Sequence, residues 1–382
     1  MFDYETLKLI WWLLLGILFI GFGVTGGFDL GVGAMLRVIG RSDNDRKVMI
    51  NCIGPTWDGN QVWLILGAGA IFAAWPLVYA SAFSVLYPAM LAALFALFFR
   101  PTGFEYRAKI ADARWRAFWD WALVVGGAIP TIVFGIAFGL VLQGIPFHYD
   151  ADMRIIMDGG LLDTLTPFAL FAGLMSLVML SMHGAAFINM KSRDHVQMQA
   201  RRWMRLLALI LIVLLALGGI WIATGVQGYV LASTGDINQA LTPLHQHVFR
   251  AAGAWLKNFN TMPWMWGAPA LGFAGAALAA MLSTAPRLAL VASGLSVAGV
   301  ILTAGFAAFP FILPSSSMPG QSLTVWNASA SQHSLSLMLI AAIIFIPLIL
   351  AYTSWVYRVL RGPVRSEDVN SSEYGTHGQF IL

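Results

Sequence analysis

The chain has 382 residues, of which 59% are hydrophobic and 10% are charged, and its mean hydropathy is +0.75. Soluble domains carry about 25% charged residues, so this composition excludes a soluble globular protein and indicates an integral membrane protein. The net charge of +4 does not indicate a nucleic-acid binder, because the basic residues lie in loops between apolar segments. The single cysteine, Cys52, excludes an intrachain disulfide and a cysteine-based metal site.

Nine apolar segments have about the length of 20 residues that a membrane-spanning helix needs. The second and third are separated only by Trp75-Pro76, where proline cannot continue a helix, so we expect a tight hairpin there. The first segment is too long for a cleaved signal and is expected to remain as a span. The sequence thus predicts an all-α integral membrane protein with about nine transmembrane helices, at residues 9–36, 59–75, 78–99, 117–143, 164–190, 206–231, 263–283, 288–312 and 334–357.

The basic residues are distributed unevenly over the loops that these segments define. With nine crossings, 18 of the 22 Lys and Arg residues fall on one side of the membrane. The remaining four are Lys8, Arg154, Arg250 and Lys257. The positive-inside rule places the basic side in the cytoplasm, so we expect the N-terminus outside and the C-terminus in the cytoplasm.

Two carboxylates frame the first predicted inner loop. Asp29 is the only ionisable residue in segment 9–36, and Asp58 opens the next segment. A charged side chain in a bilayer costs roughly 2.5–3.5 kcal/mol on insertion scales, so it is seldom kept without a use. The pair therefore suggests a path for protons or cations.

Four other residues from the first four spans are expected near these acids on the inner side. Arg100 ends the third span, Glu105 lies in the loop after it, and Asp120 begins the fourth span. Trp57 precedes Asp58 directly. A simpler interpretation is that Asp58 or Asp120 only caps a helix or pairs with Arg100.

Histidine is the usual haem or metal ligand, and His183 is the only one of the seven histidines that lies within a predicted span. A lone histidine in a membrane protein is more often a hydrogen-bonded packing residue. No pair of haem ligands stands out, and we predict no metal site in this chain.

Several strings in the sequence match one known family in order over nearly the whole chain. The WDGNQVW string is specific, and together the strings resemble subunit II of the cytochrome bd-type quinol oxidases, a family that includes the cyanide-insensitive oxidases. The matching strings are YETLKLIWW (4–12), GFDLGVG (27–33), WDGNQVW (57–63), FAAWP (72–76), FFRP (98–101), RWR (114–116), GAWL (253–256), LTAG (302–305) and FPF (309–311).

The resemblance implies an enzyme of the bacterial inner membrane that oxidises quinol, reduces O2 to water and contributes to the proton-motive force. It implies a heterodimer with a homologous subunit I, which ligates two b-type haems and one d-type haem. This chain would then have no catalytic residue of its own. A structural quinone in this chain and small accessory subunits are left open.

The family architecture is two four-helix bundles plus one extra helix, which agrees with nine spans. On that pattern residues 1–143 form the first bundle and residues 144–312 the second. Residues 313–357 form an outer loop and the ninth helix, and residues 358–382 form a cytoplasmic tail.

The resemblance also implies a proton route from the cytoplasm, with matching polar positions at Asp29, Trp57, Asp58, Arg100 and Asp120. We predict that Asp58 is the entry acid and Asp29 the relay, with Trp57, Arg100, Glu105 and Asp120 in support. Many family members carry an acid where this chain has Gly26 and a histidine where it has Thr56, which weakens the case for a complete route. The alternatives are a secondary transporter that works alone without haem, and a purely structural scaffold.

Overall fold

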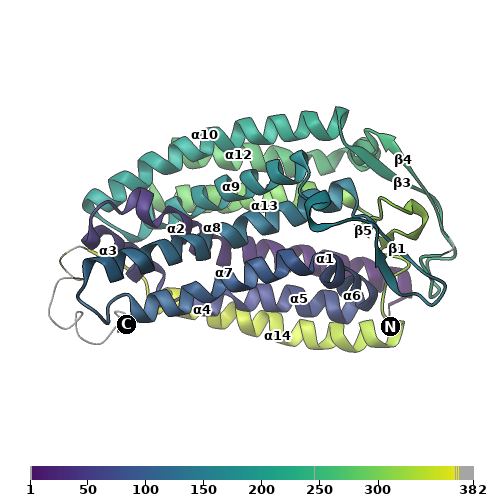
Figure 1. The fold of residues 1–382 in the computed structure, drawn as a ribbon, viewed down its shortest axis with the longest axis horizontal. Coiled ribbons are helices and arrows are strands. Elements are labelled where there is room, and N and C mark those ends of the chain that lie inside the picture. Colours follow the sequence, from purple (N-terminus) through teal and green to yellow (C-terminus); the bar gives the residue numbers. More distant parts are fainter. Residues whose placement is uncertain (1, 245, 366, 368, 370–382) are drawn as a thin grey trace.

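The computed structural model describes residues 2–244, 246–365, 367 and 369 of the chain. Long helices lie roughly along one axis, and the short strands gather at the end where the N-terminus lies (Figure 1). The α-helices are α1 (Tyr4–Val24), α2 (Gly26–Ile39), α3 (Asp43–Ile53), α4 (Trp57–Asn60), α5 (Val62–Ala74), α6 (Pro76–Val85), α7 (Tyr87–Tyr106), α8 (Ala113–Gln143), α9 (Pro167–Lys191), α10 (Asp194–Thr224), α11 (Lys257–Thr261), α12 (Gly267–Met281), α13 (Pro286–Ala308) and α14 (Gln332–Val359).

Three antiparallel two-stranded sheets pair β1 with β2, β3 with β4 and β5 with β6. They lie in the connections between α8 and α9, between α10 and α11, and between α13 and α14. The sequence analysis did not predict them, because each strand is short. Their bounds are β1 (Phe147–Tyr149), β2 (Ile155–Met157), β3 (Gln227–Ser233), β4 (His247–Ala252), β5 (Phe311–Leu313) and β6 (Leu323–Thr324).

The predicted fold class is confirmed. Among the described residues, eight helical segments are long and apolar enough to cross a membrane, and a bent pair can supply a ninth span. The first span consists of two helices, α1 and α2, that meet at Thr25. Eight or nine spans therefore agree with the expected count.

The predicted tight hairpin at Trp75-Pro76 is wrong in detail. The chain does bend there, by 119° between Trp57–Ala74 and Pro76–Val85, but it continues as the ten-residue helix α6. A second break follows at Leu86, where Pro88 lies in the first turn of α7 and favours a new helix start. The third long helix therefore begins at Tyr87 instead of near residue 78.

Glycine contacts hold α2 between α8 and α9. A Cβ atom built on Gly31 would lie 1.8 Å from the Leu180 carbonyl oxygen of α9, and one on Gly127 of α8 would lie 2.5 Å from the Leu30 carbonyl oxygen. Only glycine permits backbones to approach so closely, which is the usual way that membrane helices pack. This packing buries the first half of α2, including Asp29 in its first turn.

An unexpected buried cation lies at the end of the molecule where the N-terminus lies. Lys8 of α1 is 0% exposed, and its Nζ donates to the carbonyl oxygens of Ile237 at 2.8 Å, Gln239 at 3.2 Å and Trp326 at 3.0 Å. The three carbonyls replace the water that a buried ammonium group loses. Lys8 thereby ties the first helix to two loops that are more than 200 residues away in the chain.

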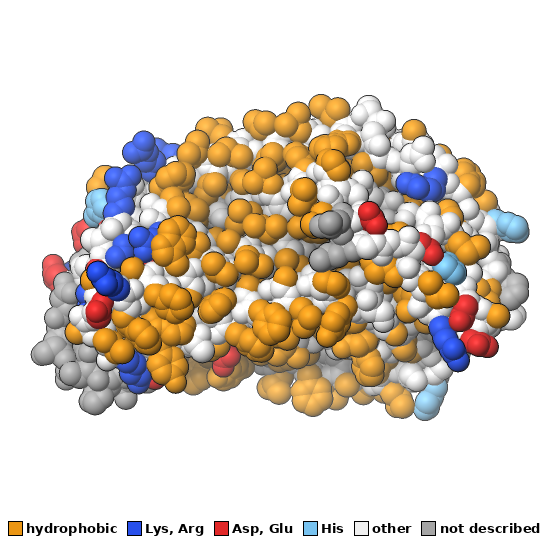
Figure 2. Space-filling view, viewed as in Figure 1, with side chains coloured by type: hydrophobic (Ala, Val, Ile, Leu, Met, Phe, Trp, Pro, Cys, Tyr) orange, Lys and Arg blue, Asp and Glu red, His pale blue; other side chains and the backbone are white. Residues whose placement is uncertain are grey.

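The visible surface divides into an apolar middle and two polar ends. Figure 2 shows hydrophobic side chains over the middle of the molecule and most of the visible Lys and Arg at the end away from the N-terminus. Exposed apolar residues also lie along α10, α13 and α14, among them Leu209, Val291 and Ile343. Below, the end that carries these Lys and Arg residues, among them Lys47, Arg202 and Arg287, is called the basic end.

Candidate functional site

Asp29 is buried at the start of a helix inside the membrane. It lies in the first turn of α2, because the helix breaks at Thr25, and it is 0% exposed. The interruption is local, because the backbone N–H of Thr25 still donates to the Gly21 carbonyl oxygen and Tyr4–Ile39 together form one apolar span.

Two side chains from distant parts of the chain fix the carboxylate. Asn60, the last residue of α4, donates from Nδ2 to Asp29 Oδ2 at 2.7 Å. The hydroxyl of Tyr357, near the end of α14, donates to Asn60 Oδ1 at 2.8 Å. The other carboxylate oxygen, Asp29 Oδ1, is buried and has no hydrogen-bond partner among the described residues. Asp29 is therefore held on one side and free on the other.

Arg100 of α7 lies near this carboxylate. Both residues line one small cavity of about 10 Å³, roughly the space that a single water molecule needs. Arg100 is 3% exposed, and neither of its terminal nitrogens has a hydrogen-bond partner in the described part of the chain. Its guanidinium carbon lies 5.4 Å from the centre of the Trp57 ring, an orientation that favours cation–π attraction.

Asp58 is not part of this buried group. It lies in α4 and is exposed. Across residues 2–244, 246–365, 367 and 369, no hydrogen bond or ion pair engages its carboxylate. A Cβ atom on the adjacent Gly59 would meet nothing within 4 Å, so this face of α4 is open.

Glu105 is also exposed and pairs with Lys109 at 2.8 Å, but the predicted loop position is wrong, because Glu105 lies in the last turn of α7. Such exposed pairs contribute little. Of the residues predicted from the sequence, the structure therefore brings Asp29, Arg100 and Trp57 together and leaves Asp58 and Glu105 on the surface.

Asp120 forms a second buried group, and the suggested pairing with Arg100 is wrong. Its carboxylate is 0% exposed and lies 2.6 Å from Arg107 Nε and 2.7 Å from Arg46 Nε. Arg107 also bonds Asp43 of α3 at 2.8 Å. Arg100 is turned instead toward the cavity that it shares with Asp29.

The charge at Asp43 is stabilised by this second group. Partial burial alone would raise the pKa of Asp43, but the positive charges of Arg107, Arg116 and Lys47 outweigh it and hold that pKa below its usual value. The chain from α3 to α8 is thus tied together by a network of charges at the basic end.

His183, the histidine within a predicted span, is not free to ligate a haem or metal ion. His183 Nδ1 lies 2.8 Å from Ser293 Oγ, and Nε2 lies 2.8 Å from the Val24 carbonyl oxygen. Both ring nitrogens are therefore engaged in packing contacts. In addition, no group of three or more His, Cys, Asp and Glu residues in the described part of the chain could hold a metal ion.

Sequence reasoning missed Asn60 and Tyr357. Asn60 could have been found, because it lies two residues after Asp58 in the specific WDGNQVW string. Nothing in the sequence indicated the contact of Tyr357 with Asn60, because 297 residues separate the two. Near the end of a span, a tyrosine is typical of an interfacial aromatic belt.

With this geometry described, the chain can be compared with known proteins. Residues 7–360 match the family of cytochrome bd terminal oxidase subunit II. The chain belongs to this family. Subunit 2 of the cytochrome bd-I ubiquinol oxidase of Escherichia coli (strain K12) is 47% identical over 382 residues, which are 100% of both chains. A probable cytochrome oxidase subunit 2 of Haemophilus influenzae is 45% identical and covers 99% of this chain and 100% of its own.

A solved bd oxidase structure shares the fold of this subunit. That structure, from Geobacillus thermodenitrificans, has a TM-score of 0.68 and 16% sequence identity, and covers 93% of this chain and 98% of its own. As a bd oxidase subunit II, the chain is part of an oxidoreductase complex of a respiratory membrane, and a second large subunit and haems belong to that complex. The transporter alternative is not favoured.

Proposed function

We propose that this subunit supports a partner subunit I in a heterodimer that oxidises ubiquinol and reduces O2 to water. The support is the full-length likeness to a protein named as a ubiquinol oxidase subunit. In this proposal subunit I ligates two b-type haems and one d-type haem. The engaged ring nitrogens of His183 are consistent with this division, since they leave no free lone pair for iron.

In the same proposal, the basic end faces the cytoplasm and the N-terminus lies outside. Residues 1–143 and 144–312 form the two four-helix bundles, residues 313–357 add the outer loop and the ninth helix, and the chain from 358 onward is a cytoplasmic tail. The uneven distribution of Lys and Arg over the loops supports the orientation. The charged groups described above then lie on the side from which protons for O2 reduction are taken.

The subunit's own chemical contribution would be a proton site at Asp29. The observation that carries this proposal is a fully buried carboxylate with one oxygen fixed by Asn60 and the other without a partner. A buried carboxylate that is not neutralised by a hydrogen-bonded cation can take up and release a proton with less reorganisation than one locked in an ion pair. Arg100, across the small cavity, favours the charged form.

The step from the surface to Asp29 must involve water. Asp58 is accessible at the start of the path, but it makes no contact with the buried group. Asn60 does contact Asp29, yet an amide does not pass on protons readily, so its role is to hold the carboxylate. We infer that Asp58 attracts protons to the surface and that water carries them to the free oxygen of Asp29.

The test is Asp29→Asn in the assembled complex. Asparagine has nearly the same shape and keeps an oxygen that can accept from Asn60, so assembly and haem content should be normal. Turnover per haem and proton uptake from the cytoplasmic side should fall by roughly tenfold or more. Asp58→Asn should have a smaller effect that weakens at high salt, because an exposed charge acts through a screened field.

A scaffold role is the second candidate, because Asp29 joins three elements through Asn60 and Tyr357. If Asp29→Asn lowers the yield of the complex but leaves turnover per haem unchanged, the scaffold role holds and the proton role is wrong. Wild-type turnover together with wild-type yield contradicts both.

A further inference from the structure

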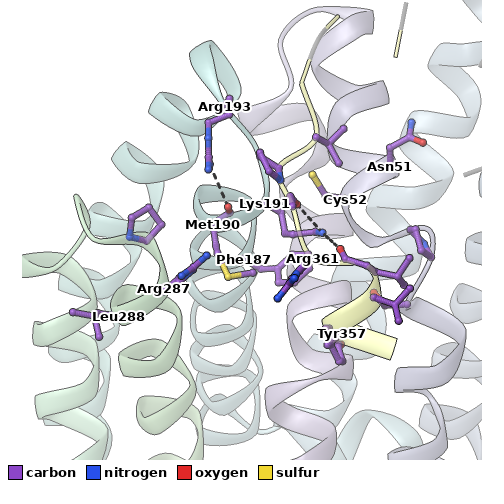
Figure 3. Close-up of a pocket in the computed structure, with 18 of the residues that line it drawn as sticks. Asn51, Cys52, Phe187, Met190, Lys191, Arg193, Arg287, Leu288, Tyr357 and Arg361 are labelled. Atoms are coloured by element: carbon purple, nitrogen blue, oxygen red, sulfur yellow. Dashed lines mark hydrogen bonds between the residues drawn. The ribbon is translucent and has the colours of Figure 1, made fainter. Parts of the chain in front are cut away.

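A cavity of about 700 Å³ opens at the basic end, and Tyr357 is one of the residues that line it. Its walls come from α3, the end of α9, the start of α13 and the end of α14 with the residues after it (Figure 3). The proposed oxidase function uses none of these walls except Tyr357. The cavity is large enough for a phospholipid headgroup and the first part of its chains.

The polar lining of this cavity is cationic. It contains Lys191, Arg193, Arg287 and Arg361, and no Asp or Glu is among the described residues that line it. Lys191 Nζ donates to the carbonyl oxygens of Leu360 at 2.6 Å and Gly362 at 2.9 Å, which fixes the chain after α14 against the end of α9. The cavity wall is thus built from contacts between distant segments.

Arg287 and Arg361 are the two cations available to a ligand. Both are exposed, and within the described part of the chain no carbonyl or carboxylate oxygen accepts from either guanidinium. Figure 3 shows them on either side of Phe187 and Met190, one from the start of α13 and the other just after α14. Two guanidinium groups that flank one space suit an oxygen-rich anion such as a phosphate diester.

The start of α13 adds to this preference for an anion. The helix has 23 residues, begins at Pro286 and has no side-chain cap. Its first backbone N–H groups therefore have no partner inside the helix, and the end of the helix carries partial positive charge. Residues 285–288 line the cavity, so this helix end faces the same space as the two arginines.

The remaining lining is apolar and leads to the membrane-facing surface. Phe187, Met190 and Leu288 line the cavity. Leu288 is 57% exposed, and further along α13 the exposed Val291 and Leu295 continue the apolar surface. A ligand that fits both parts carries one negative charge at an interface and a hydrocarbon chain that runs into the bilayer. Basic pockets between helices on the cytoplasmic side are typical sites for anionic lipid headgroups.

We propose that this cavity binds an anionic phospholipid. Its phosphate lies between Arg287 and Arg361 at the start of α13, and an acyl chain follows Leu288 and Val291 along α13. The bound lipid fills the space between the start of α13 and the end of α14. The site is separate from the proposed proton role of Asp29.

Two other sources of negative charge could compete for the arginines. One is free inorganic phosphate. The other is this chain itself, because the segment beyond the cavity wall contains Glu367, Asp368 and Glu373. A phospholipid is favoured because the apolar lining is continuous with the exposed face of α13, which neither competitor would use.

The experiment measures lipid binding to the complete, detergent-purified oxidase complex after delipidation. The probes are palmitoyl-oleoyl phosphatidylglycerol, its phosphatidylcholine counterpart and inorganic phosphate, each counted per complex by native mass spectrometry. We expect one phosphatidylglycerol to be retained in preference to phosphatidylcholine. The double variant Arg287→Gln with Arg361→Gln should bind that lipid about 30-fold more weakly, since each Arg near a membrane surface contributes about a fivefold effect.

Control variants make each outcome decisive. Arg202→Gln removes another exposed arginine on the basic end, at α10, that does not line the cavity, and it should leave binding unchanged. Arg287→Lys with Arg361→Lys keeps the charge and should restore most of the binding. An unchanged haem spectrum in all variants shows that the complex is intact.

Three results would overturn the proposal. The first is equal retention of phosphatidylglycerol by the wild type and the Gln double variant. The second is equal binding of inorganic phosphate and phosphatidylglycerol to the wild-type complex, which would make the cavity a site for free anions. The third is binding of phosphatidylglycerol only after deletion of residues 366–382, which would show that the chain's own acidic end occupies the cavity.

Discussion

Asp29 and Asp120 are both fully buried acids near the basic end, but their surroundings are opposite. Asp120 is held between Arg107 and Arg46 at hydrogen-bond distance. Asp29 has one amide donor, one free oxygen and an arginine that shares its cavity without a hydrogen bond. A buried charge that is fully paired serves to hold the structure, whereas one that is partly paired is available for proton exchange.

The largest expected effect comes from breaking the paired site. Asp120→Ala leaves the buried Arg107 and the partly buried Arg46 without their carboxylate, which should cost about 3–5 kcal/mol of stability and most of the assembled complex. The yield of the complex and its thermal unfolding midpoint measure this. Asp58→Ala is the matched control, because that acid is exposed and unpaired; its effect should be within about 0.5 kcal/mol. Equal losses in the two variants would contradict the assignment.

The two arginines sharpen the comparison from the other side. Arg107→Gln removes bonds to both Asp120 and Asp43, so we expect a loss of about 3 kcal/mol. Arg100→Gln removes a cation that has no hydrogen bond, so stability should stay within about 1 kcal/mol of the wild type. Both can be read from thermal unfolding of the purified complex. A greater loss from Arg100→Gln than from Arg107→Gln would reverse the roles given to the two sites.

Tyr357→Phe should have a smaller effect, because it removes one hydrogen bond to Asn60 and no charge. We expect a loss of about 1 kcal/mol of stability. Turnover should fall only slightly, because Asn60 still donates to the Asp29 carboxylate. Tyr352→Phe is the control, since that tyrosine is 62% exposed on the same helix. If Tyr352→Phe destabilises the complex as much as Tyr357→Phe does, the bond to Asn60 contributes nothing.

The smallest effect is a dependence on acid. The pKa of Asp43 is lowered from its usual value of 3.8 by Arg107, Arg116 and Lys47, against the effect of burial. An acid whose pKa is lower in the folded state than in the unfolded chain stabilises the folded state at any pH above its pKa in the unfolded chain. This contribution is lost as the pH falls through the pKa of the folded state. Asp43→Asn should therefore lower the unfolding midpoint at pH 6 and have less effect near pH 3. A constant difference across that range would contradict this.

The comparison also shows where the sequence analysis was sufficient. The membrane fold and the approximate number of spans could be predicted from the long apolar segments and the distribution of Lys and Arg, and the family from strings such as WDGNQVW. Asp29 was identified as an unusual acid because it is the only ionisable residue in its segment. The exact helix breaks at Thr25 and Leu86 were missed, since hydropathy does not change there.

Hydropathy and local motifs depend only on residues that are close together in the chain. The sequence by itself therefore determined which segments cross the membrane and that Asp29 is an acid within one of them. The partner of each acid was decided only by the tertiary structure. Arg100 and Arg107 are seven residues apart and look equivalent in the sequence, yet one lines the cavity at Asp29 and the other binds Asp120. Tyr357 reaches Asn60 across 297 residues. The physical reason is that helix packing, which glycines such as Gly31 permit, sets which side chains meet, and that geometry is not visible in any one segment.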